Sequence, residues 1–403
     1  MITVTAKATH AQTRRHNNRL VLKTVYDQGP LSRADVARST NLTATTVSTV
    51  IAELLEEGLV EEIGAISTER GKPPTLVGLV NDARYVIALD LSRNIFQGSI
   101  LNLRGEIQQR THLPVAGRTG DQALALAHTL IDGLLPLATK PLLGIGVGAP
   151  GIIDLNHNVI RRAANFGWEN LALGQQLAQR YGLHVQVVND IQAVLLAEFL
   201  FGDYKNTQDM VVVRIGNGIG ASILSNGQLL HGNGTGAGEI GHVVVVKNGE
   251  RCGCGNDGCL ETVASSRAIV KQAQALARRH PRSRLNQLAA QPEAITIDTV
   301  IQAFQAGDRL LHPLIADVAG HLGRMIAHLI AIVGMPRVML CGSVTGFGQP
   351  LLEQIRQEVA QRTLVGRMNE PQIDLVSLTT DLSDLVMMGA AATLFANELG
   401  LFL

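Results

Sequence analysis

The first 60 residues place apolar side chains with the period of an α-helix in three successive segments. The first segment, residues 18–28, ends at the sequence DQGP. Ser32 followed by Asp35 is a capping-box pattern, which predicts the start of a short second helix. The sequence NLT then predicts a tight turn, after which Thr43 can cap a third helix that ends at Gly58.

Two short helices around a tight turn predict a helix-turn-helix, and the two strands of a wing are predicted after it in LVEEIGAIST and PTLVGLV. Short polar side chains at the start of the second of these helices can approach base edges and phosphates. The extended cationic loop between the two strands suits a minor groove, although an ordinary proline-containing hairpin loop is the alternative interpretation. The candidate DNA-binding residues are Arg33, Thr43, Thr45, Thr46, Ser48, Gly71, Lys72 and Pro73.

From about residue 83 the pattern changes to that of an α/β protein. Three strand-like runs come first (RYVIALDLS, NIFQGSILNL and EIQQRTHLPV), and a helix at about 119–138 and the apolar strand LLGIGVGAPG follow. Three strands followed by alternating helices and strands recur in degraded form later in the chain, which predicts two α/β lobes. A cleft between two such lobes is a usual place for a small ligand.

Composition and charge narrow the classes of protein. With 403 residues, the chain is long enough for two or three domains. Its formal net charge is zero, so no overall basicity indicates nucleic acid or an anionic membrane. Residues 1–40 nevertheless carry seven basic against two acidic side chains, and residues 53–62 carry five glutamates. This asymmetry is expected if one face meets phosphate, although a solvated charged surface is the commoner meaning of any single cluster.

Neither a secretion signal nor a membrane span is predicted. The first twenty residues lack the apolar core of a signal peptide. The apolar segment at 311–335 is interrupted by Asp317, His321 and Arg324, which favours a buried helix over a membrane span. Three of the four cysteines are crowded together, unlike the disulfide framework of a secreted protein, so a cytoplasmic location is expected.

The crowded cysteines form the pattern Cys252-Gly-Cys254-x4-Cys259, which begins ten residues after His242. Zinc prefers four nitrogen or sulfur ligands in a tetrahedron, and three thiolates with one imidazole supply them. A disulfide would leave an odd thiol, and pairing across one residue is strained. Because the protein fills all four positions, we predict a structural zinc ion. Cys341 lies in an apolar strand and is expected to be a small buried residue.

Two carboxylates flank this predicted zinc site. Glu239 precedes His242 by three residues, and Glu261 follows Cys259 by two. A loop held by zinc would keep both carboxylates in one place. Carboxylates that accept hydrogen bonds from hydroxyls suit a polyol ligand.

Over essentially its whole length the chain resembles the ROK family of repressors and sugar kinases. The resemblance rests on GNGTGAGEIGHVVV followed by CGCGNDGCLE, and on GVGAPGIID, NFGW and VND in the same order. It implies an actin-like (ribonuclease-H-like) two-lobed sugar-kinase fold. The N-terminal winged helix-turn-helix resembles that of the family's repressors for xylose, N-acetylglucosamine and glucose control.

The resemblance also implies domain boundaries and sugar-binding residues. The expected domains are a DNA-binding domain at 1–80, a first lobe at 81–195 completed by a C-terminal helix at 384–403, and a second lobe with the zinc site at 196–383. The implied sugar-binding residues are Asn165, Asn189, Asp190, Glu239, His242 and Glu261. Of these, Asp190 holds the position of the base that takes the proton from the sugar hydroxyl in the kinases.

One departure from the family's kinases changes the expected function. Those kinases carry D-x-G-G-T on the first hairpin, where glycines let the backbone close on the ATP phosphates, and this chain has DLSRN at 90–94. Asn217 also stands where threonine is usual in the second glycine-rich loop. A protein that retains this carboxylate at Asp190 but binds no phosphoryl donor would bind sugar without phosphorylating it. It would then act as a sugar sensor. The chain is therefore predicted not to be an enzyme.

The predicted function is a sugar-responsive transcriptional repressor. As a homodimer or tetramer it would bind double-stranded operator DNA and release it when a monosaccharide or its phosphate binds in the cleft. Two alternatives stay open at this point: an active ATP-dependent sugar kinase with an added DNA-binding domain, and a repressor that a protein partner controls.

Overall fold

The structure, a computed structural model, describes residues 9–65, 74–92, 94–204, 207–232, 236–335, 337–363, 370–378 and 380–401. The chain divides into two compact units. The first unit comprises Met1–Val188 and Met387–Leu403, and the second unit comprises Asn189–Val386. The domain boundaries expected from the family resemblance stay predictions.

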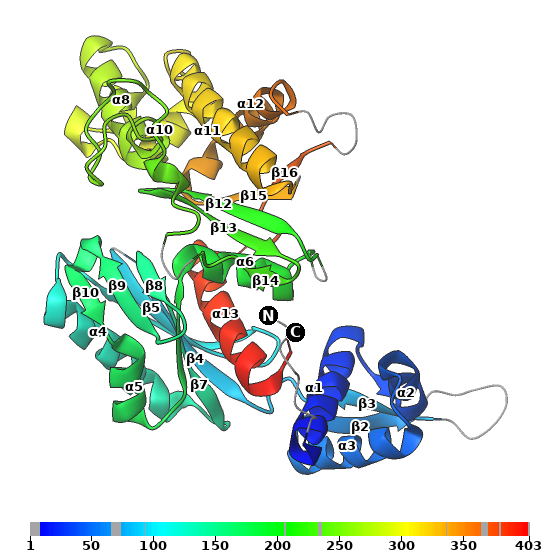
Figure 1. The fold of residues 1–403 in the computed structure, drawn as a ribbon. Helices are drawn as coiled ribbons and strands as arrows, with labels where there is room; N and C mark the ends of the chain where they lie inside the picture. The colour runs from blue at the N-terminus through cyan, green and yellow to red at the C-terminus, as the bar shows by residue number, and fades with distance from the viewer. Residues whose placement is uncertain are drawn as a thin grey trace, which may run out of the picture. The chain divides into compact units, whose positions relative to one another are not determined.

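The first unit begins with the predicted winged helix-turn-helix (Figure 1). Its elements are α1 (His10–Gln28), β1 (Leu31–Ser32), α2 (Arg33–Thr40), α3 (Ala44–Glu56), β2 (Val60–Ala65) and β3 (Thr75–Leu79), with the strands in the order β1-β3-β2. The capping box of Ser32 and Asp35 forms as predicted, and the Thr43 side chain accepts a hydrogen bond from the Thr46 backbone N–H. Helix α1 starts eight residues before the predicted segment because a polar capping box of Thr9 and Gln12 begins it.

Hydrogen bonds from four cationic side chains join the winged helix-turn-helix to the rest of the first unit. Arg84 donates to the Glu57 carbonyl oxygen at 2.9 Å and Arg104 to that of Tyr26 at 2.9 Å. The Arg104 guanidinium also lies 4.4 Å from the centre of the Tyr26 ring. On α1, Arg19 and Lys23 donate to the carbonyl oxygens of the C-terminal residues Asn397 and Leu401, at 2.6 and 3.3 Å.

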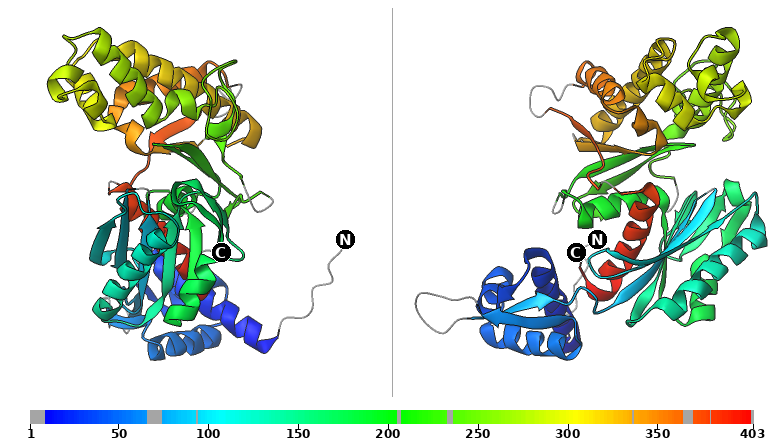
Figure 2. Two further views of the ribbon diagram at one scale, coloured as in Figure 1. Left: turned by 90° about the vertical axis from the view of Figure 1, so that its left-hand side faces the viewer. Right: turned by 180° about the vertical axis from the view of Figure 1, so that it is seen from behind.

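The remainder of the first unit is built on a five-stranded sheet in the order β11-β7-β4-β5-β6. Its elements are β4 (Tyr85–Leu91), β5 (Ile95–Leu101), β6 (Ile107–Pro114), α4 (Gly120–Leu134), η1 (Leu135–Leu137), β7 (Leu142–Ala149), α5 (Leu173–Tyr181), β11 (Val185–Asn189), α13 (Leu382–Leu394) and a π-helical turn (Phe395–Leu399). Figures 1 and 2 show α4 and α5 on one face of this sheet and α13 on the other. The three consecutive strands β4, β5 and β6 and the final helix α13 confirm the predicted elements.

Glycines on β7 let α13 lie close to the sheet. Ile145 and Val147 point into the core under α4 and α5, so Gly144 and Gly146 point to the opposite face. A Cβ atom on Gly146 would lie 2.5 Å from the Ala390 carbonyl oxygen of α13. The backbone of α13 therefore packs directly on β7 at Gly146, where any larger side chain would force the helix away from the strand.

A three-stranded sheet follows β7, in a region for which the sequence analysis predicts no strands. Its order is β10-β9-β8, formed by β8 (Ile152–Asp154), β9 (Val159–Ala163) and β10 (Trp168–Leu171), with η2 (Ala164–Phe166) between the last two. Phe166 and Trp168 pack on each other and on Phe96, with ring centroids 4.6 to 6.5 Å apart. Short strands of mixed polarity carry no alternating pattern, and this aromatic cluster holds them in place.

The second unit carries another five-stranded sheet, in the order β14-β13-β12-β15-β16. Its elements are α6 (Asp190–Phe201), β12 (Met210–Ile215), β13 (Ile219–Ser225), β14 (Gln228–Leu229), η3 (Ile240–His242), α7 (Glu261–Ala264), α8 (Ser266–Arg279), α9 (Leu285–Leu288), η4 (Pro292–Ala294), α10 (Ile297–Gln305), α11 (Leu311–Val333), β15 (Arg337–Cys341), η5 (Ser343–Phe347), α12 (Gln349–Ala360) and β16 (Gln372–Leu375). Helix α6 packs on one face of the sheet, and the larger helical layer covers the other face (Figure 1).

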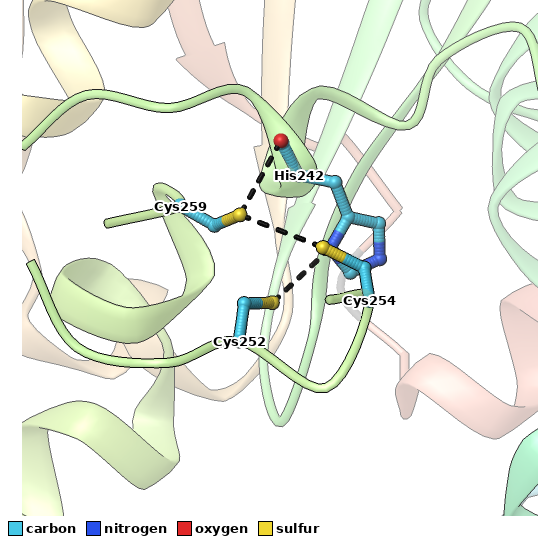
Figure 3. A group of neighbouring side chains, drawn as sticks. All are labelled: His242, Cys252, Cys254 and Cys259. Atoms are coloured by element: carbon cyan, nitrogen blue, oxygen red, sulfur yellow. Dashed lines mark hydrogen bonds between the residues drawn. The ribbon is translucent and has the colours of Figure 1, made fainter. Parts of the chain in front are cut away.

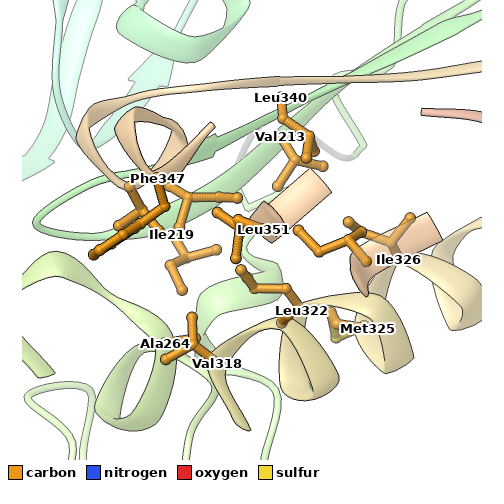
Figure 4. Packing of buried hydrophobic residues seen from close by; sticks show 14 of the residues in the cluster. Val213, Ile219, Ala264, Val318, Leu322, Met325, Ile326, Leu340, Phe347 and Leu351 are labelled. Atoms are coloured by element: carbon orange, nitrogen blue, oxygen red, sulfur yellow. The ribbon is translucent and has the colours of Figure 1, made fainter. Parts of the chain in front are cut away.

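Helix α11 is the centre of the core of the second unit. Leu322, Met325 and Ile326 of α11 pack against Val213 and Leu340 of the sheet (Figure 4). By length and composition α11 is the one helix in the described part of the chain that could cross a membrane, but 67% of its most apolar window is buried inside the protein. Burial on this scale is that of the core helix that the sequence predicts for this segment.

Candidate functional site

The predicted zinc ligands form a compact cluster in the second unit. One ligand atom from each of His242, Cys252, Cys254 and Cys259 lies within 4.8 Å of the others (Figure 3). The Cys252 sulfur lies 3.5 Å from His242 Nδ1, and the sulfur atoms of Cys254 and Cys259 are 3.6 Å apart. All four cysteines of the chain are free thiols.

These distances fit a tetrahedral metal ion. Bonds of about 2.3 Å to sulfur and about 2.0 Å to nitrogen place two sulfur ligands about 3.8 Å apart, and a sulfur and a nitrogen ligand about 3.5 Å apart. A disulfide would instead need a sulfur separation of about 2.0 Å. The cluster could therefore hold a metal ion with all four positions filled by the protein.

The thiols of the cluster differ in acidity. Burial raises the pKa of Cys259 to about 12, whereas a hydrogen bond from the Asn256 backbone lowers the pKa of Cys254. A metal ion binds thiolates, so it must displace protons from both. Elsewhere in this unit, burial raises the pKa of Cys341 to about 12 and only 2% of the residue is exposed, which confirms the prediction of a buried small side chain.

His242 presents its two ring nitrogens to different groups. Nδ1 faces the Cys252 sulfur, and Nε2 lies 3.8 Å from Oε2 of Glu239. A metal on Nδ1 would therefore leave the Nε2 proton directed toward this carboxylate. This geometry allows one imidazole to serve both the metal cluster and the adjoining polar residues.

Glu239 is held by close backbone packing on β13. Gly238 has φ of +92°, and a Cβ atom there would overlap the Ala221 carbonyl oxygen. The Ala221 N–H in turn donates to the Gly238 carbonyl oxygen at 2.7 Å. The Glu239 side chain keeps 46% exposure, and partial desolvation raises the pKa of its carboxyl group, with a further rise from the charges of Asp190 and Glu261.

Glu261 lies at the first position of α7, two residues beyond Cys259. Its Oε2 accepts a hydrogen bond of 3.3 Å from the Ile219 N–H at the glycine-rich turn between β12 and β13. Its Oε1 pairs with Arg267 at 2.7 Å, and the same arginine donates to the Asn217 carbonyl oxygen at 2.9 Å. The carboxylate thus ties the turn to the segment that follows the cysteines.

Asn189 and Asp190 begin helix α6. The Asn189 Oδ1 accepts hydrogen bonds from the Ile191 and Gln192 N–H groups, at 2.9 and 3.3 Å, and caps the helix. Asp190 is 7% exposed, and its Oδ2 is ion-paired with the Arg214 guanidinium. The carboxylate at the expected sugar-facing position therefore already has a cationic partner.

Asn165 and the DLSRN hairpin both belong to the first unit. Asn165 is exposed in η2, where the buried rings of Phe166 and Trp168 fix the turn around it. The Ser92 hydroxyl donates to Asp90 Oδ2 and lies 3.0 Å from the Ile95 carbonyl oxygen. Arg93 lies outside the described residues. The Ser92 side chain is therefore held within its own hairpin.

The candidate DNA-binding residues play different local roles. The hydroxyl groups of Thr43 and Thr46 lie 2.8 Å apart at the start of α3 and are engaged in capping. Thr45 and Ser48 are exposed on the same helix. Arg33 pairs with Glu62 of β2 at 2.8 Å. The predicted loop residues Gly71, Lys72 and Pro73 lie outside the described residues.

Sequence reasoning missed the arginines that pair with the two carboxylates, Arg214 with Asp190 and Arg267 with Glu261. Arg214 lies within the apolar strand MVVVRI, which the sequence analysis treats only as a strand. A single charged residue in such a strand needs a partner, so it could have indicated an ion pair. Arg267 follows a helix cap and gives no sequence signal.

Two family models match the chain. The model described as the ROK family matches residues 86–397, and the model described as winged helix-turn-helix DNA-binding matches residues 14–61. Together they cover the winged helix-turn-helix, except its second and third strands, and nearly all of both lobes.

Several proteins with similar sequences are named as transcriptional regulators. The xylose repressor of Caldicellulosiruptor bescii is 30% identical over 395 residues, which cover 97% of this chain and 98% of that protein. The DNA-binding transcriptional dual regulator NagC of Escherichia coli is 29% identical over 366 residues, covering 89% and 88%. The DNA-binding transcriptional repressor Mlc of Escherichia coli is 29% identical over 358 residues, covering 88% and 87%.

Solved structures show the same architecture. A ROK family transcriptional regulator, a homologue of the Escherichia coli Mlc protein, is similar with a TM-score of 0.83 at 26% identity and covers 95% of this chain and 97% of its own. A ROK family glucokinase from Streptomyces griseus, in complex with glucose and AMPPNP, has a TM-score of 0.68 at 25% identity and covers 77% and 98%. The regulator matches a larger share of the chain than the kinase does.

Proposed function

Because the chain belongs to the ROK family, we propose that it is a sugar-responsive DNA-binding repressor of carbohydrate uptake or catabolism genes. The observation that carries this proposal is the winged helix-turn-helix on the same chain as the family's sugar-kinase fold, an arrangement that the xylose repressor matches over 97% of this chain. A monosaccharide or its phosphate would be the inducer, and the protein would act in the cytoplasm.

The winged helix-turn-helix supplies the DNA contacts in this proposal. The exposed hydroxyls of Thr45 and Ser48 on α3 can reach base edges or phosphates in a major groove. A homodimer or tetramer would place two such helices on the half-sites of a palindromic operator. Thr43 and Thr46 would contribute through the cap that fixes the start of α3.

The carboxylates around the cysteine cluster supply the sugar contacts. Asp190, Glu239 and Glu261 all belong to the second unit, and the charges of the other two raise the pKa of Glu239. Hydroxyl donors of a sugar would stabilise the charged form of Glu239, whose pKa burial and these two neighbouring charges raise. Asn165, Asn189 and the His242 Nε2 proton are the further proposed sugar contacts.

The metal in the cluster is proposed to be zinc in a structural role. Zinc would supply a rigid tetrahedral link among His242 and the three cysteines, with no open position for a reacting water. This link would hold the His242 imidazole toward Glu239, and it would fix Cys259 two residues before Glu261. The metal would therefore position the residues of the sugar site and take no part in a reaction.

Two contacts support the proposal that the chain is not a kinase. A general base must be free to accept the proton of a sugar hydroxyl, and Arg214 already occupies Oδ2 of Asp190. Ser92 fills part of the hairpin where bare backbone would approach phosphates. Asp190 is then proposed to accept a hydrogen bond from the sugar without taking its proton.

The repressor mechanism requires a defined free-energy difference. Sugar must bind more tightly to the state with low DNA affinity, and a hundredfold change in operator affinity corresponds to about 2.7 kcal/mol of coupling. The test is fluorescence anisotropy of a labelled operator fragment, titrated with free and phosphorylated monosaccharides. If none of them changes operator affinity, the inducer model is wrong and control by a protein partner takes its place.

A further inference from the structure

Two loops at the edge of the helical layer of the second unit border a hollow of about 500 Å³. The end of α8 contributes Arg279, and the loop that follows it contributes Arg282 and Arg284. The other loop follows α10 and contributes Arg309. None of these residues belongs to the proposed DNA, metal or sugar sites. We propose that this hollow binds a small anion that carries two or more phosphate groups.

The basic side chains that line the hollow outnumber the acidic ones, with four arginines against one aspartate, Asp308. In the part of the chain that the structure describes, the four arginines have neither an ion pair nor a side-chain hydrogen bond. The neighbouring Glu293 pairs at 2.6 Å with Arg278, which does not line the hollow. In a chain with a formal net charge of zero, four unpaired guanidinium groups in one hollow are a local concentration of charge that attracts anions.

The only acidic side chain in the lining is already used by the backbone. Asp308 is 7% exposed, and its Oδ2 accepts hydrogen bonds from the Ser283 hydroxyl at 2.6 Å and the Arg284 N–H at 2.9 Å. Its Oδ1 accepts from the Leu310 N–H at 3.1 Å. Asp308 therefore links the two loops by hydrogen bonds. Because its carboxylate oxygens accept from Ser283, Arg284 N–H and Leu310 N–H, the arginine side chains remain available to an anion from solution.

The chemistry of the lining selects phosphate over a neutral sugar. Guanidinium groups donate paired hydrogen bonds that match phosphate oxygens, and arginines offer no acceptor for a hydroxyl proton. The volume lies within the range of about 300–1,000 Å³ that is usual for small-molecule sites. Arg282 and Arg309 come from different loops, so an anion with two or more charged groups could contact both at once.

The test is isothermal titration calorimetry of the full chain with tripolyphosphate, in the absence of DNA and sugar. We expect saturable binding at one site per chain, weakened about tenfold or more for each arginine removed in the double variant Arg282→Ala/Arg309→Ala. The matched control is Arg278→Ala with Glu293→Ala, which removes a neighbouring ion pair outside the hollow and should leave binding within about twofold. Thermal unfolding of each variant shows whether the fold is retained.

Three results would overturn the proposal. If the wild type and a folded double variant bind tripolyphosphate equally well, the anion binds somewhere other than the hollow. Equal loss in the control variant, whose net charge is unchanged, would show that the loss is not specific to the arginines of the hollow. Binding of a glutamate-rich peptide through the same arginines, without binding of tripolyphosphate, would make the hollow a protein-docking surface. Since DNA and sugar are absent, each result is independent of whether the chain is a sugar-responsive repressor.

Discussion

At the scale of single residues, the partner of a charged group decides what that group can do. Asp190 has the position that the family resemblance gives to a proton acceptor, yet this buried carboxylate is ion-paired with the half-buried Arg214 guanidinium. Taking a proton from a sugar would neutralise Asp190 and remove its ion pair with Arg214, which costs free energy. Accepting a hydrogen bond requires no such change, so the pair turns a reactive position into a recognition position.

Replacement of Asp190 by Asn tests this assignment. We expect sugar affinity to fall by about 1.5–3 kcal/mol, roughly 10-fold to 150-fold, because a charged hydrogen-bond acceptor is lost. Operator affinity without sugar should stay within about twofold. Calorimetry with the inducing sugar measures the first and anisotropy the second, and Glu250→Gln, an exposed carboxylate paired with Lys271, is the control. Sugar-dependent ATP turnover that Asp190→Asn abolishes would instead restore the kinase alternative.

Replacement of Cys254 by Ser tests the metal cluster. We expect the variant to retain less than about a tenth of the wild-type zinc and to lose the sugar response, because the loop that positions Glu261 loses one ligand. Metal content by mass spectrometry and sugar titration of operator binding are the measurements. Cys341→Ala, outside the cluster, should keep its zinc. Full sugar affinity in a zinc-free protein would contradict the proposed link.

At the scale of elements, different residues at the start of α3 serve helix stability and DNA recognition. The Thr43 side chain caps the helix, whereas Thr45 and Ser48 lie exposed two and five residues further on. One short polar segment thus serves two purposes, and residue type alone does not distinguish them.

Single alanine substitutions should distinguish those purposes. Thr43→Ala should lower the free energy of unfolding by about 1 kcal/mol, because the cap is lost. Ser48→Ala should leave stability within about 0.5 kcal/mol and weaken operator binding by about 0.5–1.5 kcal/mol. Thermal unfolding and operator anisotropy give the two quantities. A Ser48→Ala variant with unchanged operator affinity would remove Ser48 from the proposed interface.

Close packing of α13 on β7 gives a second prediction for an element. Gly146→Ala should lower the free energy of unfolding by about 1–3 kcal/mol, because the new methyl group meets the Ala390 backbone. Gly133→Ala is the control: nothing lies within 4 Å of its Cβ position in α4, and it should be neutral or stabilising by up to about 1 kcal/mol. Trp168, the single tryptophan and a buried residue of the first unit, reports unfolding by fluorescence. Equal stability of the two variants would contradict the packing argument.

At the scale of the whole molecule, side-chain contacts of Arg19, Lys23, Arg84 and Arg104 tie the winged helix-turn-helix to the rest of the first unit. Arg104 makes two of them, a hydrogen bond to the Tyr26 carbonyl oxygen and a contact with the Tyr26 ring. Burial of Tyr26 raises the pKa of its hydroxyl to about 12, so the ring stays neutral beside the cation at physiological pH. A contact of this kind can carry the effect of a bound sugar to the DNA-binding elements.

Replacement of Arg104 by Met tests this route. Operator affinity without sugar should change by less than about threefold, whereas the sugar-induced decrease should shrink to less than about a tenth of the wild-type factor. Sugar titrations of operator binding measure both. Arg118→Met, whose hydrogen bonds go to Pro114 and Val115 of its own loop, is the control. An undiminished sugar effect in Arg104→Met would place the coupling elsewhere.

Elements with a strong periodic pattern could be predicted from the sequence. The capped helices α2 and α3, the strand pair β12 and β13, and the four-residue metal cluster all follow from local patterns or spacings. The β8–β10 sheet could not be predicted, since the packing of Phe96 on Phe166 and Trp168 brings together residues about 70 apart. The Arg214–Asp190 ion pair could not be predicted for the same reason: the sequence shows which charged residues exist but not which of them form ion pairs.

Helix α13 has a consequence for how the protein is made. The first unit needs residues from both ends of the chain, and 198 residues of the second unit are synthesised between its two parts. At about 5–20 residues per second, the ribosome takes roughly 10–40 s to deliver α13 after β11 has emerged. During that interval the α13 face of β7, glycines included, has no cover. The first unit can therefore be completed only after the second unit has been synthesised, when Arg19 and Lys23 can reach their C-terminal partners.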